Sequence, residues 1–258
     1  MQKLFYLVSF SIILFLGCNS GTSKSQNKLA AEAADIEKGD FKKVTFKAED
    51  GLIVTADYYP NSDAERIIIL CHQAGHSRGE YKDIAPRLVD SGYACLSVDL
   101  RFGNFVFDVI NETAALAKKN NVPASNYDAL KDITAAINYV DSNSTKKIYL
   151  WGSSYSASLA LMVAKTDDRI KRVIAFSPGE YFANQNTVKP KIMGLNTPVF
   201  ITGSKIEYKI VVEPLINVLP KHNVTAYMPN FQTDHGSKTL WPTMVNADEV
   251  YAELFKFL

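Results

Sequence analysis

Runs of apolar residues along the chain predict a domain built around a β-sheet from residue 41 onward. Val44–Lys47 and residues 53–59 are strand-like runs on either side of a turn at Asp50 and Gly51, which predicts an antiparallel hairpin. Residues 67–71 differ because they are continuously apolar, as is typical of a parallel strand covered by helices on both faces. The central sheet is therefore expected to start at this strand.

Strand-like and helix-like segments then alternate to the end of the chain. We expect strands at 93–99, 147–152, 171–177, 198–202 and 224–229, and helices at 80–90, 126–142, 155–165, 210–220 and 244–257. This alternation predicts βαβ units and an α/β fold with a doubly wound, mostly parallel sheet. Two longer connections, residues 101–125 and 178–196, are too short for a substantial helical lid, so no large cap is expected.

Residues 1–17 have the pattern of an export signal: a cationic residue followed by an apolar run shorter than the roughly 20 residues that cross a bilayer. The segment ends at Cys18 in a pattern that resembles a bacterial lipoprotein processing site, although Phe15 is bulkier than an ordinary signal cleavage site favours. We expect lipidation of Cys18, a flexible linker at 18–40, and an exported protein anchored to a bacterial membrane, in the periplasm or at the cell surface. A plain signal peptide or an uncleaved anchor is the alternative.

Composition and charge limit the remaining choices. The chain has 258 residues, which leaves 41–258 for one catalytic domain. Lys and Arg total 28 against 27 Asp and Glu, so no overall field favours nucleic acid as a partner. No pattern in the chain predicts its oligomeric state.

The strongest chemical signal is a serine at a predicted strand-to-helix junction. The strand at 147–152 runs into Gly152-Ser153-Ser154-Tyr155-Ser156 and then into an Ala- and Leu-rich helix. Small residues two before and two after Ser154 permit the tight, strained turn of a nucleophile elbow. A plain helix cap by Ser153 or Ser154 is the alternative, but this context favours Ser154 as a nucleophile.

A serine nucleophile needs a base, and His235 is the best-placed histidine. It follows the last predicted strand and precedes the last helix, so it should lie over the carboxyl ends of the strands, where Ser154 also projects. His222 precedes a strand and fits a solvated loop better. His72, His76 and Cys71 lack a recognised metal-ligand spacing, so we expect no metal.

Several motifs together resemble the α/β-hydrolase superfamily, and more narrowly its capless esterases similar to dienelactone hydrolase. They are Tyr58-Tyr59-Pro60 after the opening turn, His72-Gln73-Ala74-Gly75, Asp99-Leu100-Arg101-Phe102-Gly103, and the elbow at Gly152–Ser156. The resemblance covers roughly residues 41–258. Gln73 and Ser156 stand where the family has glycine, and dienelactone hydrolases proper use a cysteine nucleophile where this chain has Ser154.

The resemblance also implies an acid and an oxyanion hole. The acid falls between nucleophile and histidine in the family order, which favours Glu207, one residue later than the usual aspartate, with Glu180 as the alternative. Asp234 is too close to His235 in sequence to face its ring. The oxyanion donors are expected to be the backbone amides of Ala74, or next Gln73, and of Tyr155.

The sequence therefore predicts a serine hydrolase that transfers an acyl group from a small-molecule ester to water and requires no cofactor. A serine peptidase of related fold and a non-catalytic binding protein with this fold are the alternatives. The aromatic residues of the two long connections suggest an apolar acyl or aryl site, although they fit a core equally well: Phe102, Phe105, Phe107, Tyr181 and Phe182.

Overall fold

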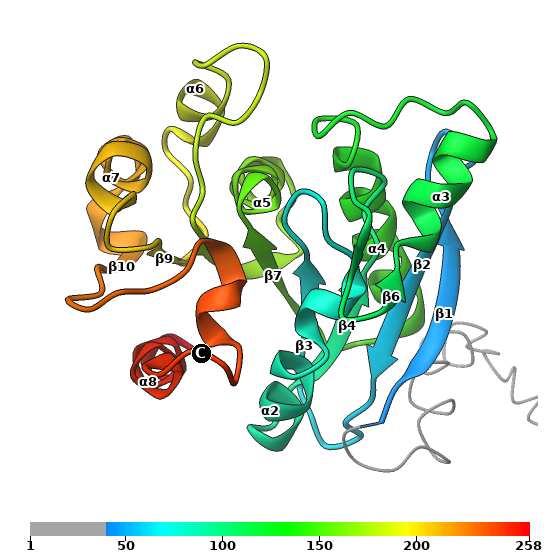
Figure 1. Cartoon of the computed structure of the whole chain (residues 1–258), viewed down its shortest axis with the longest axis horizontal. Coiled ribbons are helices and arrows are strands. Elements are labelled where there is room, and N and C mark those ends of the chain that lie inside the picture. The colour runs from blue at the N-terminus through cyan, green and yellow to red at the C-terminus, as the bar shows by residue number, and fades with distance from the viewer. Residues whose placement is uncertain (1–39) are drawn as a thin grey trace, which may run out of the picture.

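A computed structural model describes residues 40–258, and within this range one sheet has the strand order β1-β2-β4-β3-β7-β8-β9-β10 (Figure 1). β2 is antiparallel to both neighbours, and the other pairs are parallel. The strands are β1 (Lys42–Lys47), β2 (Ile53–Tyr59), β3 (Arg66–Cys71), β4 (Ala94–Val98), β7 (Lys147–Ser153), β8 (Ile170–Phe176), β9 (Val199–Thr202) and β10 (Val224–Tyr227). The predicted hairpin and doubly wound sheet are confirmed. The predicted signal at 1–17 and Cys18 lie outside the described residues.

Helices cover both faces of this sheet. They are α2 (Ile84–Asp90), α3 (Glu112–Lys119), α4 (Leu130–Asn143), α5 (Tyr155–Thr166), α6 (Val188–Ile192), α7 (Glu213–Ile216) and α8 (Ala247–Phe257), with 3-10 turns η1 (Arg78–Tyr81), η3 (Lys221–Asn223) and η4 (Gly236–Leu240) and a π-helical turn η2 (Tyr208–Val212). Figure 1 shows α2 and α8 on one side of the sheet and α4, α5 and α7 on the other. Between residues 40 and 258 no helix combines the length and hydropathy needed to span a membrane.

The continuous apolar run of β3 is explained by a core on each face of the sheet. Ile67 and Ile69 pack into the core with α4 and α5, whereas Ile68 and Leu70 pack into the core with α2 and α8. Successive side chains of a strand point to opposite faces, so a strand covered on both faces buries every position. Cys71 and Cys95 are buried free thiols in opposite cores, which rules out a disulfide between them.

Local chemistry changes several predicted elements. The helix expected at 80–90 is divided between η1 and α2. The helix expected at 210–220 consists of η2 followed by α7, which has Pro214 in its first turn. A proline lacks the amide that a continuous helix needs. The connection at 101–125 contains α3 and a small unpredicted hairpin of β5 (Phe105–Val106) and β6 (Val109–Ile110), and no large cap is present in the described chain.

We expect Gly152→Ala to destabilise the protein. A Cβ at this position would collide with the backbone of Ser156 and Ala157, so the start of α5 would have to shift. Overpacking of this kind costs about 1–3 kcal/mol. Denaturant unfolding of the variant measures the loss, and Gly92→Ala is a useful comparison because a Cβ there meets nothing within 4 Å and only its positive φ (94°) opposes the change. An unfolding free energy equal to that of the unmodified protein would contradict the expectation for Gly152.

Candidate active site

Ser154 occupies a strained turn between β7 and α5. Its φ and ψ are 61° and −126°, a conformation that a residue with a side chain rarely adopts. The turn ends a parallel strand at its carboxyl edge and starts a helix, so Ser154 stands at the N-terminus of α5, where the amide of Tyr155 has no partner within the helix. This geometry is what a nucleophile elbow requires.

Ser156, where the family pattern has glycine, links the elbow to the neighbouring strand β3. Its hydroxyl lies 2.7 Å from the carbonyl oxygen of Cys71 and accepts a hydrogen bond from the Ser153 amide at 2.9 Å. The Tyr81 hydroxyl donates to the same Cys71 carbonyl at 2.7 Å. The loop that begins at His72 is therefore held in register with the elbow. The departure from glycine supplies a contact that a glycine could not make.

His235 and Glu207 form a close pair at the same edge of the sheet. His235 Nδ1 lies 2.6 Å from Glu207 Oε2, and the histidine ring is partly exposed whereas the carboxylate is mostly buried. A carboxylate only accepts hydrogen bonds, so Nδ1 carries the proton of this contact, and in the neutral tautomer Nε2 is the nitrogen with a free lone pair. Within residues 40–258 no hydrogen bond joins Ser154 to His235, and such bonds are commonly long before substrate binds.

The environment of Glu207 favours its ionised form. Burial alone would raise the pKa of this carboxyl, but hydrogen bonds from His235, Ser177 and the Ser204 amide outweigh burial and bring the pKa to about 2. The Ser204 amide donates to Oε1 at 2.8 Å, and the Ser177 hydroxyl donates to the same oxygen. Glu207 is thus a fixed negative charge beside the histidine.

The loop that carries His235 is attached to the elbow. The Ser237 amide donates to Ser153 Oγ at 2.9 Å, and the indole of Trp151 donates to Ser237 Oγ at 2.9 Å. Gly236 has a φ of 67°, and a Cβ there would collide with the Ser153 hydroxyl. Only glycine therefore lets this loop approach the elbow closely enough to bring His235 near Ser154.

Neither of the other two candidate carboxylates faces the histidine ring. Glu180 accepts hydrogen bonds from the amides of Thr187, Val188 and Lys189 at 2.8–2.9 Å, so it caps the start of α6. Asp234 accepts the His235 backbone amide at 2.7 Å and pairs with Lys238. The alternative acid Glu180 therefore does not face His235, because both of its carboxylate oxygens accept hydrogen bonds from amides at the start of α6.

The predicted oxyanion loop rests on buried polar groups. His72 is fully buried, and its Nδ1 donates to the Gln73 carbonyl at 2.7 Å while Nε2 accepts from the Leu100 amide at 2.9 Å. Burial lowers the pKa of His72 and so keeps this ring neutral. These contacts give His72 a structural role under the loop.

Glu80 decides which amide of this loop is available. The Gln73 amide donates to Glu80 Oε2 at 2.9 Å, and His76 Nδ1 lies 3.0 Å from the same oxygen. The Gln73 amide is thereby taken up inside the protein and is not a free oxyanion donor. Ala74, the next residue, and Tyr155, the first residue of α5, remain as the pair of candidate donors.

Two buried arginines brace the connection at 101–125. Arg78 donates to Asp57 at 2.9 Å and to Asp99 at 2.7 Å, and Arg101 donates to Asp132 at 2.8 Å. Both arginines are nearly inaccessible to solvent. Arg101 and Asp99 belong to the Asp99–Gly103 motif, so these pairs explain why that motif contains charged residues that do not contact the elbow.

The aromatic residues of the long connections divide into two groups. Phe102 packs edge-on against Tyr155 with ring centroids 5.5 Å apart, and Tyr181 lies edge-on to His235 at 6.3 Å. The Ser154 hydroxyl faces the Tyr181 phenol, whose pKa is raised mainly by burial. Phe182 is a buried core residue, and the rest lie further along the surface: Phe105, which is exposed, and Phe107, which packs on Trp241. Tyr181 therefore lies beside the candidate nucleophile, and Phe102 packs against the residue that follows it.

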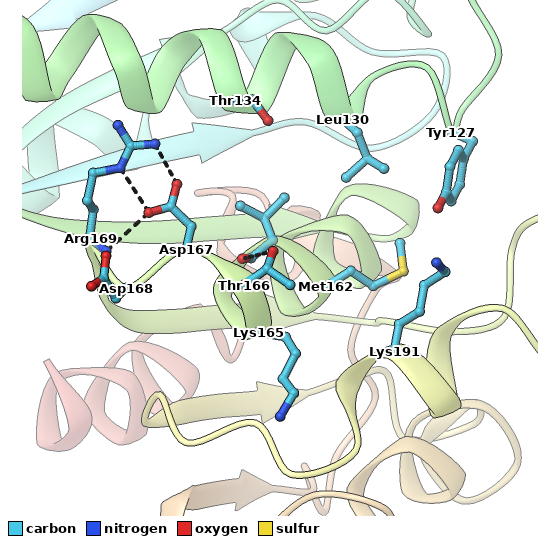
Figure 2. A pocket seen from close by; sticks show the side chains of 11 residues that line it. Tyr127, Leu130, Thr134, Met162, Lys165, Thr166, Asp167, Asp168, Arg169 and Lys191 are labelled. Carbon is cyan, nitrogen blue, oxygen red and sulfur yellow. Dashed lines mark hydrogen bonds and ion pairs between the residues drawn. The ribbon is translucent and has the colours of Figure 1, made fainter.

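A separate pocket of about 820 Å³ lies between α4, the end of α5 and α6 (Figure 2). Figure 2 shows Tyr127, Lys165 and Lys191 around it, with Arg169 paired to Asp167 at one end. None of the triad candidates lines this pocket. In the part of the chain that the structure describes, no three His, Cys, Asp or Glu side chains are arranged to hold a metal ion.

The sheet order and the serine turn define an α/β-hydrolase fold. Residues 53–228 match the model of the Dienelactone hydrolase family, and the chain belongs to this family of hydrolases. It is 28% identical over 185 residues to the quorum-quenching protein AidA of Acinetobacter baumannii, covering 67% of this chain and 56% of AidA, so the chain spans just over half the length of that curated relative.

Solved structures show the same fold. An esterase of Pyrococcus furiosus superposes with a TM-score of 0.63 at 18% identity, covering 85% of this chain and 90% of the esterase. A dienelactone hydrolase of Anabaena variabilis gives a TM-score of 0.65 at 14% identity, covering 85% of this chain and 98% of that enzyme. The resemblance to this family that the sequence motifs indicated is confirmed.

The pKa of Glu207 predicts how stability depends on pH. Its folded value of about 2 lies below the ordinary 4.5, so the ionised carboxylate stabilises the folded state above pH 4.5. This contribution is lost as the pH falls from 4.5 toward 2. We expect Glu207→Gln to be less stable than the unmodified protein at pH 7 and the difference to shrink between pH 4.5 and pH 2. Denaturant unfolding at pH 7, 4.5 and 3 measures it, and a difference that stays constant to pH 3 would contradict the assignment.

Proposed function

We propose that the protein is a serine hydrolase that cleaves an ester of a small molecule. The observation that carries the proposal is the short contact from His235 to Glu207 beside the strained turn of Ser154. A histidine whose Nδ1 proton is held by a carboxylate presents Nε2 as a base, and a serine exposed by an elbow is the group that such a base activates. Membership of a hydrolase family supports the same reaction.

In the proposed mechanism Ser154 Oγ attacks the ester carbonyl carbon while His235 Nε2 takes the hydroxyl proton. The amides of Ala74 and Tyr155 donate to the oxyanion that forms on the carbonyl oxygen. The histidinium then gives its proton to the departing alcohol, which leaves an acyl group on Ser154. Water, deprotonated by His235, attacks this acyl group, releases the carboxylic acid and restores the serine. Glu207 keeps the ring oriented and stabilises its protonated form.

A fluorophosphonate probe and an ester series test this proposal. The probe should label the purified protein at Ser154, as identified by peptide mass spectrometry, and hydrolysis rates for aryl esters of increasing acyl length should show a preference. The panel should include a quorum-quenching assay, because the curated relative is named for that activity. Peptide amides test the peptidase alternative. A folded protein that neither reacts with the probe nor hydrolyses any ester would overturn the proposal and favour a binding role.

We also propose that the protein is exported and anchored through a lipid on Cys18. The polar segment after Cys18 is suited to a tether between a membrane and the domain that starts at residue 41. The Cys18→Ser variant should move from the membrane fraction to the soluble fraction of expressing bacteria. If the unmodified protein is itself soluble after cell breakage, the anchor is wrong.

A further inference from the structure

Ser177, the first residue after β8, is buried beside the candidate triad in an unusual backbone conformation. Its side chain is 1% exposed and its φ is 52°, in the left-handed region. The Ser177 amide donates to the carbonyl oxygen of Thr202 on the next strand at 2.7 Å. Tyr181 donates its hydroxyl to the Ser177 carbonyl at 2.9 Å, so hydrogen bonds hold this turn from both sides.

The Ser177 hydroxyl connects the two loops that carry the acid and the histidine. It donates to Glu207 Oε1 and accepts the amide of Gly236 at 2.9 Å. A hydroxyl has one proton and two lone pairs, so it can make both bonds at once. It therefore fixes the distance between the Glu207 turn and the residue that follows His235.

This contact also decides which carboxylate oxygen faces the histidine. Oε1 accepts from Ser177 and from the Ser204 amide, which leaves Oε2 for His235 Nδ1. With Oε1 held by two donors, the carboxylate cannot rotate about its last bond without breaking both contacts. Glu207 is longer than the aspartate usual in this position, and the extra bond gives it a freedom that these contacts remove.

The backbone at Ser177 does not by itself call for serine. A left-handed φ costs a residue with a side chain roughly 1 kcal/mol, and glycine adopts it without that cost. The hydroxyl is what distinguishes serine from a less strained glycine here. Strain retained next to a candidate active site points to a function for the side chain.

We propose that Ser177 is a positioning residue, whose hydroxyl holds Glu207 and the His235 loop in the arrangement needed for proton transfer. This inference rests on the proposed function. Loss of the hydroxyl should lower kcat roughly 10- to 100-fold, the effect of losing one hydrogen bond to a charged group. KM should stay the same, because Ser177 is buried behind the triad and does not face the substrate.

Ser177→Ala and Ser177→Gly together separate this role from a structural one. Both variants lose the hydroxyl, but Ser177→Gly also removes the backbone strain and should be more stable than Ser177→Ala. We expect the two to show the same fall in kcat despite their different stabilities. Ser158→Ala is the matched control: Ser158 is equally buried, and its hydroxyl bonds the Gly179 backbone at 2.7 and 2.9 Å and not the side chains of the triad candidates. It should lose stability and keep kcat within about threefold.

Two outcomes would overturn the inference. In the first, Ser177→Gly keeps the kcat of the unmodified protein. In the second, kcat across the three variants follows their unfolding free energies and is independent of the hydroxyl. Neither outcome affects the proposed function, which is tested by the fluorophosphonate probe, the ester series and the Ser154 variant. The two ideas are therefore tested separately.

Discussion

Ser154→Ala is expected to lower kcat/KM for ester hydrolysis by about 10⁴- to 10⁶-fold. The turn at Ser154 directs one hydroxyl over the carboxyl edge of the sheet, and no other side chain of the elbow is free to replace it, since Ser153 and Ser156 are buried and bonded to neighbouring loops. Loss of the nucleophile in serine hydrolases leaves only the catalysis provided by the oxyanion hole and substrate binding. Steady-state hydrolysis of the best ester of the series measures the effect.

The control for this experiment is Ser158→Ala, one turn further along α5, which should retain activity. Ser154→Ala should also unfold at about the same denaturant concentration as the unmodified protein, because alanine keeps the Cβ of Ser154 and the hydroxyl that it removes does not cap α5. Retention of more than about a tenth of the activity by a folded Ser154→Ala variant would exclude Ser154 as nucleophile.

Glu207→Gln is expected to lower kcat by about 10³- to 10⁴-fold. The amide that replaces the carboxylate lacks the negative charge that stabilises protonated His235, and it can present an N–H to Nδ1, which favours the wrong tautomer of the ring. The bond that is lost joins His235 Nδ1 to Glu207 Oε2 at 2.6 Å. Single-turnover measurements with excess enzyme isolate this effect on the chemical step.

The matched variant is Glu180→Gln, the same chemical change at the other candidate acid. Because Glu180 caps the amides that begin α6, this variant should lower the thermal midpoint and leave kcat nearly unchanged. A large loss of kcat in Glu180→Gln with little loss in Glu207→Gln would reverse the assignment of the acid.

The fold was largely predictable from local patterns. Continuous apolar runs such as β3 identified strands buried on both faces, and the spacing between them identified the βαβ units. The hairpin of β5 and β6 was not predicted, because its turn places Phe107 and Asp108 at φ values of 50° and 63° where glycine or asparagine is the usual signal. The pattern of 210–220 predicted one helix, but Pro214 lacks the amide that a continuous helix needs, so the segment divides into η2 and α7.

The candidate site was predictable only in part. No pattern in the sequence assigned Ser177 to the triad, because its bonding partners lie far away along the chain. Ser177 lies 30 residues from Glu207 and 59 from Gly236 in the chain. A serine between a strand and a proline has many uses, and no local spacing shows that its hydroxyl reaches two other loops. The one signal for Ser177 in the sequence was its place in Ser177-Pro178-Gly179, at the carboxyl end of a predicted strand. Polar side chains at the carboxyl ends of parallel strands tend to gather at the functional site.

By itself the sequence determined the strand, turn and helix around Ser154 and the placement of His235 at the same edge of the sheet. Both follow from short-range patterns, since a strand that runs into small residues and then a helix has few ways to turn. Only the tertiary structure placed Glu207 and not Glu180 against His235, paired the Gln73 amide with Glu80, and brought Ser177 to Glu207. Those choices depend on which of several similar polar groups meet in space, and that is set by packing of the sheet and its loops across the whole domain.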